Sequence, residues 1–282
     1  MASDTALRAI TDDGAFRVIT IQTTDTVRGA TAAQGVTGKI AHVLADLLTG
    51  SILVRQSMAP DLRVQLILQP NPTMRLVADS HPEGIARGLA QIAPGADMQF
   101  GPKSVLQVAR TLHNGVIQQG VVQVMEEGGV SGGLMRYMQL SEQVVSMIAV
   151  GCHIGPTGEI LAAGGYLVQL LPEVEQGPLM VMTERLKDFV DIVPLLADGK
   201  GEPATLMSEL LYGMPYTMVG QDVVKFGCTC DETRLAATLA TLPTEDIESM
   251  ITDGRVIEAS CDYCGRNYQF APERLRGLLA KS

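Results

Sequence analysis

Cysteine supplies the residues of this chain whose type and spacing could do chemistry. Four of the five cysteines form two close pairs near the C-terminus, Cys228-Thr-Cys230 and Cys261-Asp-Tyr-Cys264, with residues 231–260 between them. If a folded loop brings the pairs together, they offer four thiolates, the donor set of a tetrahedral all-sulfur Zn²⁺ site. Gly265 fits this prediction, because a residue without Cβ permits the positive φ that turns backbone N–H groups toward the sulfurs.

The same cysteines leave two other interpretations open. A thioredoxin-like redox pair should lie at a helix N-terminus in a βαβ unit, whereas a strand-like run precedes Cys261 and Tyr268-Gln-Phe270 follows it. A purely structural zinc ribbon is the stronger alternative. The single residue between Cys228 and Cys230 favours a redox role, because this gap is tighter than that of ordinary zinc fingers. Oxidation of close thiols to disulfides removes ligands and releases the metal, so folding would depend on redox state.

Three other motifs could suggest an active site. Gly129-Val-Ser-Gly-Gly133 has the Gly-x-Ser-x-Gly pattern of hydrolases, but 126–128 separate it from the preceding strand and His153 follows too soon for a triad, so we expect a surface loop. Gly38-Lys39 lacks the first glycine and the hydroxyl of a phosphate-binding loop. Cys152 and His153 are adjacent and cannot easily face each other, so we expect Cys152 to be a half-buried thiol.

Composition excludes several classes of protein. The chain has 282 residues, 46% of them apolar and 18% charged, which is enough to bury a large core. Its net charge of −10 opposes binding to nucleic acid or to anionic lipid. No apolar run is long enough to span a membrane, and the first residues carry acids where a secretory signal needs bases. We therefore expect a cytoplasmic protein, and the odd number of cysteines argues against a secreted disulfide scaffold.

The patterning predicts an α+β fold in three parts: an N-terminal α+β core over 1–175, a helical linker over 176–222 and a zinc-binding domain over 223–282. Alternating or apolar runs predict strands, and helical spacing of apolar residues predicts helices that cover one face of the sheet. The strands are expected at 16–22, 62–69, 116–125 and 164–171, and the helices at 37–49 and 132–146.

The expected linker consists of helices separated by glycine and proline. Pro203 is placed to begin a helix that Gly213 ends, and five methionines lie between 178 and 222. Composition alone favours methionines that fill gaps in a core, although they could also form an adaptable apolar surface. The last part of the chain is too short to depend on a core of its own, so it needs the metal.

Motifs spread over nearly the whole chain resemble a known family. Phe226-Gly-Cys-Thr-Cys230, the 231–260 gap, Cys261-Asp-Tyr-Cys-Gly-Arg-Asn-Tyr-Gln-Phe270, Tyr137-Met-Gln-Leu-Ser-Glu-Gln143 and Ala162-Ala-Gly-Gly-Tyr-Leu-Val-Gln-Leu-Leu-Pro172 are similar to the bacterial redox-regulated holdase chaperones of the heat-shock protein 33 family. One departure is Asp231, because family members commonly have serine after the second cysteine.

The resemblance implies a function and a set of roles. It makes Cys228, Cys230, Cys261 and Cys264 the ligands of one Zn²⁺ in a reduced, inactive form. Oxidation would form the Cys228–Cys230 and Cys261–Cys264 disulfides, release the zinc and unfold the zinc module and the linker. The active form would be an ATP-independent holdase, not an enzyme, that forms a homodimer, binds unfolding client proteins and passes them to ATP-dependent foldase chaperones.

The resemblance also changes the interpretation of the linker. Its apolar residues become candidate contacts for client proteins, since an uncovered Met- and Leu-rich surface adapts to many partners. These candidates are Met180, Met182, Leu186, Phe189, Met207, Leu210 and Met214. The alternative from another class is a constitutive Cys₄ zinc-ribbon adaptor that binds protein or nucleic acid, and a thiol oxidoreductase is a third.

Overall fold

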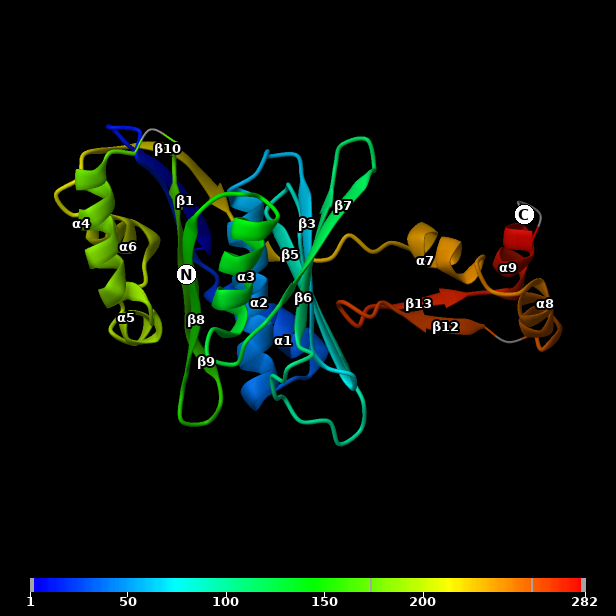
Figure 1. Cartoon of the computed structure of the whole chain (residues 1–282). Coiled ribbons are helices and arrows are strands. Elements are labelled where there is room, and N and C mark those ends of the chain that lie inside the picture. Colours follow the sequence, from blue (N-terminus) through cyan, green and yellow to red (C-terminus); the bar gives the residue numbers. More distant parts are fainter. Residues whose placement is uncertain (1–2, 173, 255, 280–282) are drawn as a thin grey trace. The chain divides into compact units, whose positions relative to one another are not determined.

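The computed structural model describes residues 3–172, 174–254 and 256–279 (Figure 1). It divides into two compact units, which span 1–226 and 227–282. The α+β prediction is confirmed, while the three-part division remains a prediction. Among the described helices, none combines the length and the apolar composition that crossing a membrane requires.

An antiparallel sheet of five strands forms one layer of the first unit. Its strands, in spatial order, are β10 (Tyr216–Val223), β1 (Thr5–Thr11), β2 (Phe16–Gln22), β9 (Ile160–Leu170) and β8 (Ser146–Ile154). The strand predicted at 16–22 is β2, and the run at 164–171 lies within β9 up to Leu170. β2 pairs along its full length with Gly164–Leu170 of β9, so that Phe16 lies opposite Leu170 and Gln22 opposite Gly164.

A second sheet of six strands forms the opposite layer. In spatial order its strands are β11 (Lys225–Phe226), β5 (Ile85–Ile92), β4 (Met74–Ser80), β3 (Arg63–Asn71), β6 (Val105–Thr111) and β7 (Ile117–Gln123). The strands predicted at 62–69 and 116–125 are β3 and β7. All neighbours are antiparallel except β11, which runs parallel to β5.

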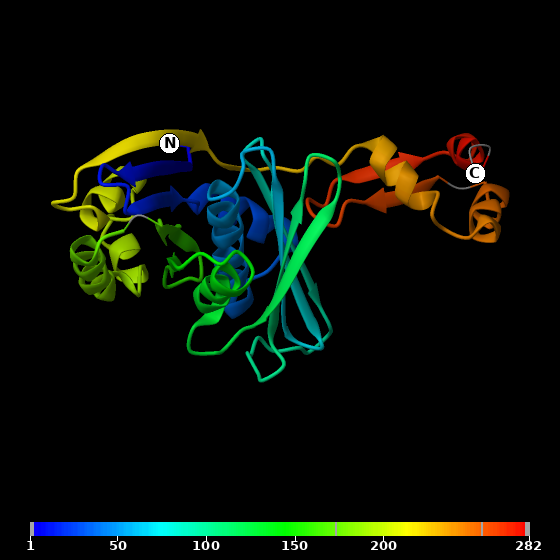
Figure 2. The same ribbon diagram turned by 45° about the horizontal axis from the view of Figure 1, so that its top comes forward.

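Three helices lie between the two sheets (Figures 1 and 2): α1 (Thr24–Gln34), α2 (Gly38–Gln56) and α3 (Gly129–Leu140). Every residue of α2 from Leu47 to Gln56 is buried, as expected of a helix with neighbours all round. The expectation that helices cover one face of a single sheet is therefore wrong. The patterns identify half-buried strands but not the sheet to which each belongs.

Two predicted helices have different ends in the structure. The helix expected at 37–49 continues to Gln56, because its second half is buried on every side. The helix expected at 132–146 begins at Gly129 and ends at Leu140. Gln143 takes a positive φ of 57° and turns the chain into β8, which leaves Val145 60% exposed instead of in the core.

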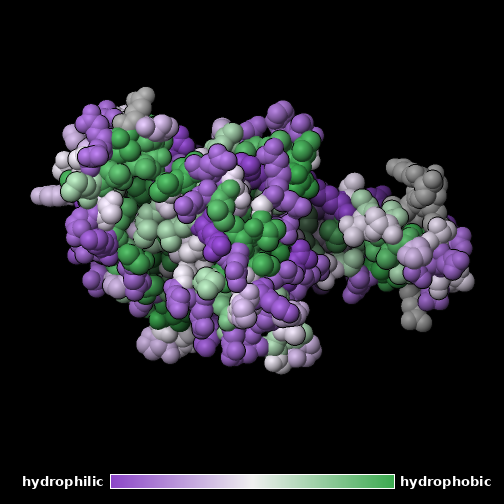
Figure 3. Space-filling view, viewed as in Figure 1, coloured by the Kyte–Doolittle hydropathy of each residue, from purple (hydrophilic) through white to green (hydrophobic). Residues whose placement is uncertain are grey.

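The outer face of the five-stranded sheet carries a second group of helices (Figure 1), which we call the outer helices: α4 (Gln176–Leu186), the 3₁₀ turn Lys187–Phe189, α5 (Val193–Ala197) and α6 (Pro203–Leu210). They share an apolar cluster with that face, in which Phe16, Val18 and Tyr166 of the sheet are buried. Figure 3 shows that apolar residues also reach the surface over this segment.

The expectation that helices continue to Asp222 is wrong for the last part of the linker. Gly213, with φ of 73°, follows the outer helices, and the chain then enters β10. This strand pairs with the edge of β1 in register from Thr5–Val223 to Thr11–Tyr216. A pairing between residues so far apart in sequence leaves no local signal.

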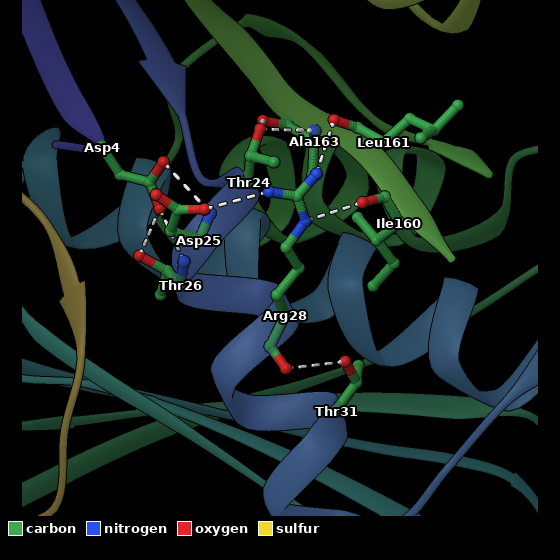
Figure 4. Close-up of polar contacts among 9 residues, drawn as sticks. All are labelled: Asp4, Thr24, Asp25, Thr26, Arg28, Thr31, Ile160, Leu161 and Ala163. Atoms are coloured by element: carbon green, nitrogen blue, oxygen red, sulfur yellow. Dashed lines mark hydrogen bonds and ion pairs between the residues drawn. The ribbon is translucent and has the colours of Figure 1, made fainter. Parts of the chain in front are cut away.

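The start of α1 is tied to both ends of this unit (Figure 4). The buried carboxylate of Asp4 accepts hydrogen bonds from the backbone N–H and the hydroxyl of Thr26, at 2.6 and 2.7 Å. The backbone carbonyl oxygen of Asp4 accepts a hydrogen bond from Val224 N–H at 2.9 Å. Arg28 donates to the carbonyls of Ile160 and Leu161 in β9. The exit from β10 is thereby fixed to the core just before the second unit begins.

The second unit is a hairpin with three short helices: α7 (Glu232–Leu239), α8 (Thr244–Thr252), β12 (Ile257–Ser260), β13 (Asn267–Phe270) and α9 (Pro272–Leu279). The strands β12 and β13 pair antiparallel, with Ile257 opposite Phe270. Within the described part of this unit, the buried apolar cluster consists of Ala236, Ile247 and Phe270. This core is much smaller than that of the first unit.

Candidate metal centre

Two irregular segments of the second unit carry the four cysteines. Cys228 and Cys230 lie in extended chain just before α7, while Cys261 and Cys264 lie in the turn between β12 and β13. The hairpin fixes one pair, and the helix that follows fixes the other. The 231–260 segment folds back on itself, so the pairs meet despite their separation in sequence.

The four Sγ atoms all lie within 4.8 Å of one another. The Sγ atoms of Cys230 and Cys264 are 3.4 Å apart, and those of Cys228 and Cys261 are 3.7 Å apart. A tetrahedron with Zn–S bonds of about 2.3 Å has edges of about 3.8 Å, so these sulfurs are spaced as ligands of one ion. The four thiols can therefore hold a metal ion. Among the common divalent cations, zinc is the one that an all-sulfur donor set favours.

The Cys261–Cys264 turn has the backbone that Gly265 was expected to allow. Gly265 has a positive φ of 68°, as predicted. The N–H groups of Cys264 and Gly265 donate to the carbonyl of Cys261 at 3.3 and 2.8 Å, and Cys261 N–H donates to the carbonyl of Arg266 at 2.9 Å. These bonds close a tight loop that presents both sulfurs on one side.

The Cys228–Cys230 segment is held by the helix after it. Asp231 is the N-cap of α7, and its side chain accepts a hydrogen bond from Arg234 N–H at 2.8 Å. The Arg234 guanidinium reaches back to the carbonyl and hydroxyl oxygens of Thr229, at 2.9 and 2.8 Å. Serine is also a good N-cap, so either residue could cap α7 at this position.

Tyr268 connects the hairpin to the first cysteine pair. Its hydroxyl donates to the carbonyl oxygen of Cys230 at 3.1 Å and lies 3.3 Å from the Sγ of the same residue. The alternation of β13 places Tyr268 on the same side as Phe270, which is fully buried. One short strand therefore supplies both a core residue and a hydrogen bond to a candidate ligand.

The electrostatics of the four thiols favour a cation among them. Burial raises the pKa of Cys230, but the hydrogen bonds from Tyr268 and Cys264 outweigh it and lower that pKa to about 7. Burial raises the pKa of Cys264 to about 12, and the neighbouring sulfurs add to the rise. The loss of one proton thus opposes the loss of the next, since the like charges lie close together. A bound cation removes this opposition.

The seven predicted client contacts lie in three kinds of environment. Met182, Met207 and Leu210 are buried against the outer face of the sheet. Leu186, Phe189 and Met214 pack partly buried against the same cluster. Met180 is 72% exposed. Most of these residues therefore lie in a covered apolar layer, and their contact with clients stays a prediction.

The other motifs do not form an active site. The Gly129–Gly133 segment begins α3 instead of forming a loop, and the Ser131 hydroxyl accepts a hydrogen bond from Val150 N–H at 3.1 Å. Gly38 and Lys39 begin α2, which follows a helix instead of the strand that a phosphate-binding loop requires. Cys152 is 2% exposed on β8, and burial raises its pKa to about 12. This thiol is therefore more deeply buried than expected, and unreactive.

Three residues of the candidate centre were not singled out for it from the sequence: Asp231 as a cap, Arg234 and Tyr268. The cap has a local signal, because Asp231 precedes an acid-opened helix. The tyrosine has a weaker one in the alternation with Phe270. The reach of Arg234 back to Thr229 depends on tertiary geometry, so spacing alone does not reveal it.

The sequence of this chain is similar to those of known proteins. The family model described as "Hsp33 protein" matches residues 4–271. A "33 kDa chaperonin" of Syntrophotalea carbinolica is 32% identical over 98% of this chain and 99% of its own length. Similar proteins of the same description from Desulfotalea psychrophila and Shouchella clausii are each 27% identical, over 98% and 99% of this chain.

A solved structure has the same fold. The crystal structure of a 33 kDa chaperonin (heat shock protein 33 homolog) from Thermotoga maritima superposes with a TM-score of 0.85 at 24% identity and covers 99% of both chains. The two sheets, the outer helices and the cysteine-bearing unit thus belong to an architecture seen in an experimental structure.

Proposed function

Because this chain belongs to the Hsp33 family, whose members compared above are named as chaperonins, we propose that it is a redox-regulated holdase chaperone. Its reduced form holds one Zn²⁺ and is inactive. Oxidation of the cysteines activates it, and the active form binds unfolding proteins without ATP and prevents their aggregation.

One observation carries the proposal: four thiols converge within 4.8 Å in a unit whose described core is three apolar side chains. Structural zinc binding in small modules is worth about 10–16 kcal/mol, which is comparable to the stability of a whole domain. When bound, the ion would keep the sulfurs as thiolates and tie the two cysteine segments together. A unit stabilised in this way depends on the chemical state of its sulfurs.

The redox step consumes the ligands themselves. Cys228 with Cys230, and Cys261 with Cys264, each form one S–S bond as two thiolates lose two electrons. A peroxide accepts these electrons, takes up two protons from the solvent and is reduced to water. In the folded centre all four cysteines are thiols and their sulfurs lie within 4.8 Å of one another, as suits a shared ion, whereas a disulfide needs about 2.05 Å, so pairing within each motif requires the segments to rearrange. Such a rearrangement accompanies unfolding of the unit.

Loss of the second unit would act on the outer helices through the strand between them. β10 and β11 connect these helices to residue 227, and both strands pair at sheet edges. We propose that the outer helices then leave the sheet. Their side chains, from Met182 to Met214, and the sheet residues beneath them would become an apolar surface for unfolding proteins.

The proposed partners follow from this surface. An uncovered apolar face also supports association with a second copy, so the active form is proposed to be a homodimer. Handover to ATP-dependent foldases completes the cycle. We propose no catalytic turnover and a cytoplasmic location, and the net charge of −10 argues against nucleic acid and anionic membranes as partners.

The test is an oxidant series in which zinc release and suppression of client aggregation are measured on the same samples. The reduced, zinc-loaded chain is treated with increasing peroxide at mildly elevated temperature. We expect both signals to rise together, and peptide mapping to find the disulfides within each motif. Cys228→Ser should uncouple the signals from peroxide. Cys152→Ala is the matched control, since this buried thiol lies outside the centre and should leave both curves unchanged.

Two results would overturn the proposal in favour of a named alternative. Client binding that is equal or tighter in the reduced, metal-loaded state indicates a constitutive Cys₄ adaptor. Catalytic turnover of a dithiol substrate by the oxidised chain indicates a thiol oxidoreductase. Full zinc release with no suppression of aggregation contradicts the holdase activity itself.

A further inference from the structure

A cavity of about 340 Å³ opens in the first unit where β1, β2, the end of α2 and β10 meet. Its wall contains three arginines, Arg8, Arg17 and Arg55, and one carboxylate, Asp222. In a chain with a net charge of −10, a cavity whose charged lining is mostly cationic is unusual. Its size lies at the lower end of the range for small-molecule sites.

Arg55 is buried without full compensation of its charge. It is 3% exposed, and its Nη2 lies 3.8 Å from the Asp222 carboxylate, the distance of a weak ion pair. Among the residues that the structure describes, no acceptor meets the Nε of Arg55. Burial lowers the pKa of Arg55 although Asp222 opposes the change. Buried donors without acceptors are costly, and a bound anion would supply acceptors.

Asp222 is shared between two arginines and cannot satisfy both. Its carboxylate lies 2.5 Å from Nη1 of Arg8, which also donates to the side-chain oxygen of Gln56. The third cation, Arg17, donates only long hydrogen bonds, at 3.3 Å to the carbonyl of Ser57 and 3.4 Å to Gln169. Within the described parts of the chain, no carboxylate lies within 4.0 Å of Arg17. The cavity therefore holds two positive charges in excess.

The backbone makes room for this arrangement. Gly220 lies opposite Arg8 in the β1–β10 pairing, and a Cβ there would lie 2.3 Å from Nη2 of Arg8. A β-bulge interrupts the register at Arg8 and Ala9. Bulges redirect side chains and are common beside functional sites. Glycine at this position thus allows the guanidinium to lie across β10 at the cavity.

Apolar side chains complete the wall. Met58 and Val219 line the same cavity, and Val219 is 50% exposed on β10. A ligand that fills the cavity would meet both guanidinium groups and apolar atoms. We propose that this cavity binds a small organic anion, with a phosphate monoester group on Arg8, Arg17 and Arg55 and an apolar body against Met58 and Val219. Paired N–H donors of arginine match phosphate oxygens in geometry as well as charge.

The test is calorimetric titration of the full-length, reduced, zinc-loaded protein with phenyl phosphate, at constant ionic strength so that screening does not vary. We expect saturable binding, and weaker binding of inorganic phosphate, which cannot use the apolar wall. Arg17→Gln should weaken phenyl phosphate at least about tenfold, the effect of losing one charge-assisted contact. Arg75→Gln is the matched control, because Arg75 is exposed on β4 outside the cavity and its loss changes the net charge equally.

Asp222→Asn gives a result of opposite sign. Removing the carboxylate frees Arg8 and Arg55 for the ligand, so phenyl phosphate should bind several-fold more tightly, whereas a merely destabilising change would weaken it. Thermal denaturation without ligand verifies that each variant is folded. The proposal is overturned if no saturable heat is seen, if Arg17→Gln and Arg75→Gln behave alike, or if Asp222→Asn weakens binding. Equal affinity for the two phosphates removes the apolar body from the proposal.

Discussion

The two units of this chain are stabilised in different ways. The first has a continuous core in which the second half of α2 is buried on all sides between two sheets. The second is shorter than the about 60 residues at which a single core becomes marginal, and its described core is Ala236, Ile247 and Phe270. A core of the first kind is insensitive to redox chemistry. Under the proposed function the second depends on four sulfurs, so one chain would combine a permanent scaffold with a conditional one.

The outer helices stand between these two extremes. They cover one face of the five-stranded sheet through buried residues such as Met207 and Leu210, but they are short and separated by turns. Short helices are marginal on their own and depend on tertiary packing. This segment can therefore be lost at a lower free energy than the central core, as local opening in proteins generally requires.

Removal of the metal should have the largest effect, because it should unfold the second unit and leave the first one folded. A chelator that strips the reduced chain should unfold the second unit, because about 10–16 kcal/mol of binding energy is lost from a unit with a small core. Hydrogen exchange followed by mass spectrometry should show loss of protection over 257–270. Peptides from α2 serve as the internal control and should stay protected. Retained protection at 257–270 after verified loss of the ion would contradict the proposed dependence.

Removing one charge from a buried cluster should destabilise the first unit. Asp79 on β4 is fully buried, and its carboxylate accepts hydrogen bonds from Arg63 at 2.6 and 2.7 Å and from Arg87 at 2.9 Å, with His81 at 3.1 Å. Asp79→Asn leaves Arg63 and Arg87 facing one another without the carboxylate, so the free energy of unfolding should fall by about 3–5 kcal/mol. Urea unfolding followed by circular dichroism measures it. The exposed Asp61→Asn is the control and should change little.

The same carboxylate predicts a pH dependence. Burial raises the pKa of Asp79, but the hydrogen bonds from His81 and Arg63 outweigh it and hold that pKa well below the usual 3.8. A lowered folded-state pKa means that the contribution to stability is complete above 3.8 and is lost as the pH falls toward the folded value. The wild type should therefore lose stability below pH 3.8 more steeply than Asp79→Asn does. If the stability of the two proteins fell equally steeply below pH 3.8, the proposed role of the Asp79 carboxylate would be refuted.

The attachment of the outer helices should show a smaller effect. Tyr166 of β9 donates its hydroxyl hydrogen to the carbonyl of Phe189 at 2.8 Å, and the two rings meet edge to face at 6.4 Å. Tyr166→Phe leaves a carbonyl unpaired and should cost about 1–3 kcal/mol. Hydrogen exchange should increase over 176–210 and stay unchanged in α2. Tyr212→Phe, at a 77% exposed position, should be neutral, and an equal effect of the two variants would count against the contact.

The candidate centre could be predicted from sequence because its signal is local and chemically specific. One residue separates Cys228 from Cys230 and two separate Cys261 from Cys264, and few other structures need thiols at such spacing. The positive φ of Gly265 is likewise a local requirement. Which sulfurs lie closest across the centre is not local, since it depends on how the hairpin meets the segment before α7.

The arrangement of sheets and linker could be predicted only in part. The strand at 216–223 could not be predicted locally, because it is defined by its pairing with β1, which lies near the N-terminus. Met180 and Met182 show the same limit. They lie two residues apart in α4, on different faces of the helix, so one is 72% exposed and the other is 1% exposed. Composition treats them alike, and only packing against the sheet distinguishes them.

The smallest effect is expected for Asp231 in the second unit, where two substitutions can distinguish its two roles. Its side chain caps α7 through Arg234 N–H at 2.8 Å and also lies 3.6 Å from the Arg234 guanidinium. Asp231→Ala removes both contacts and should cost about 1 kcal/mol, whereas Asp231→Ser keeps a capping oxygen and should lie close to the wild type. The exposed ion pair is worth little by itself. Competition with a chelator, monitored as the midpoint of zinc loss, resolves such a difference. If serine behaves like alanine, the charge matters for metal retention and the cap does not.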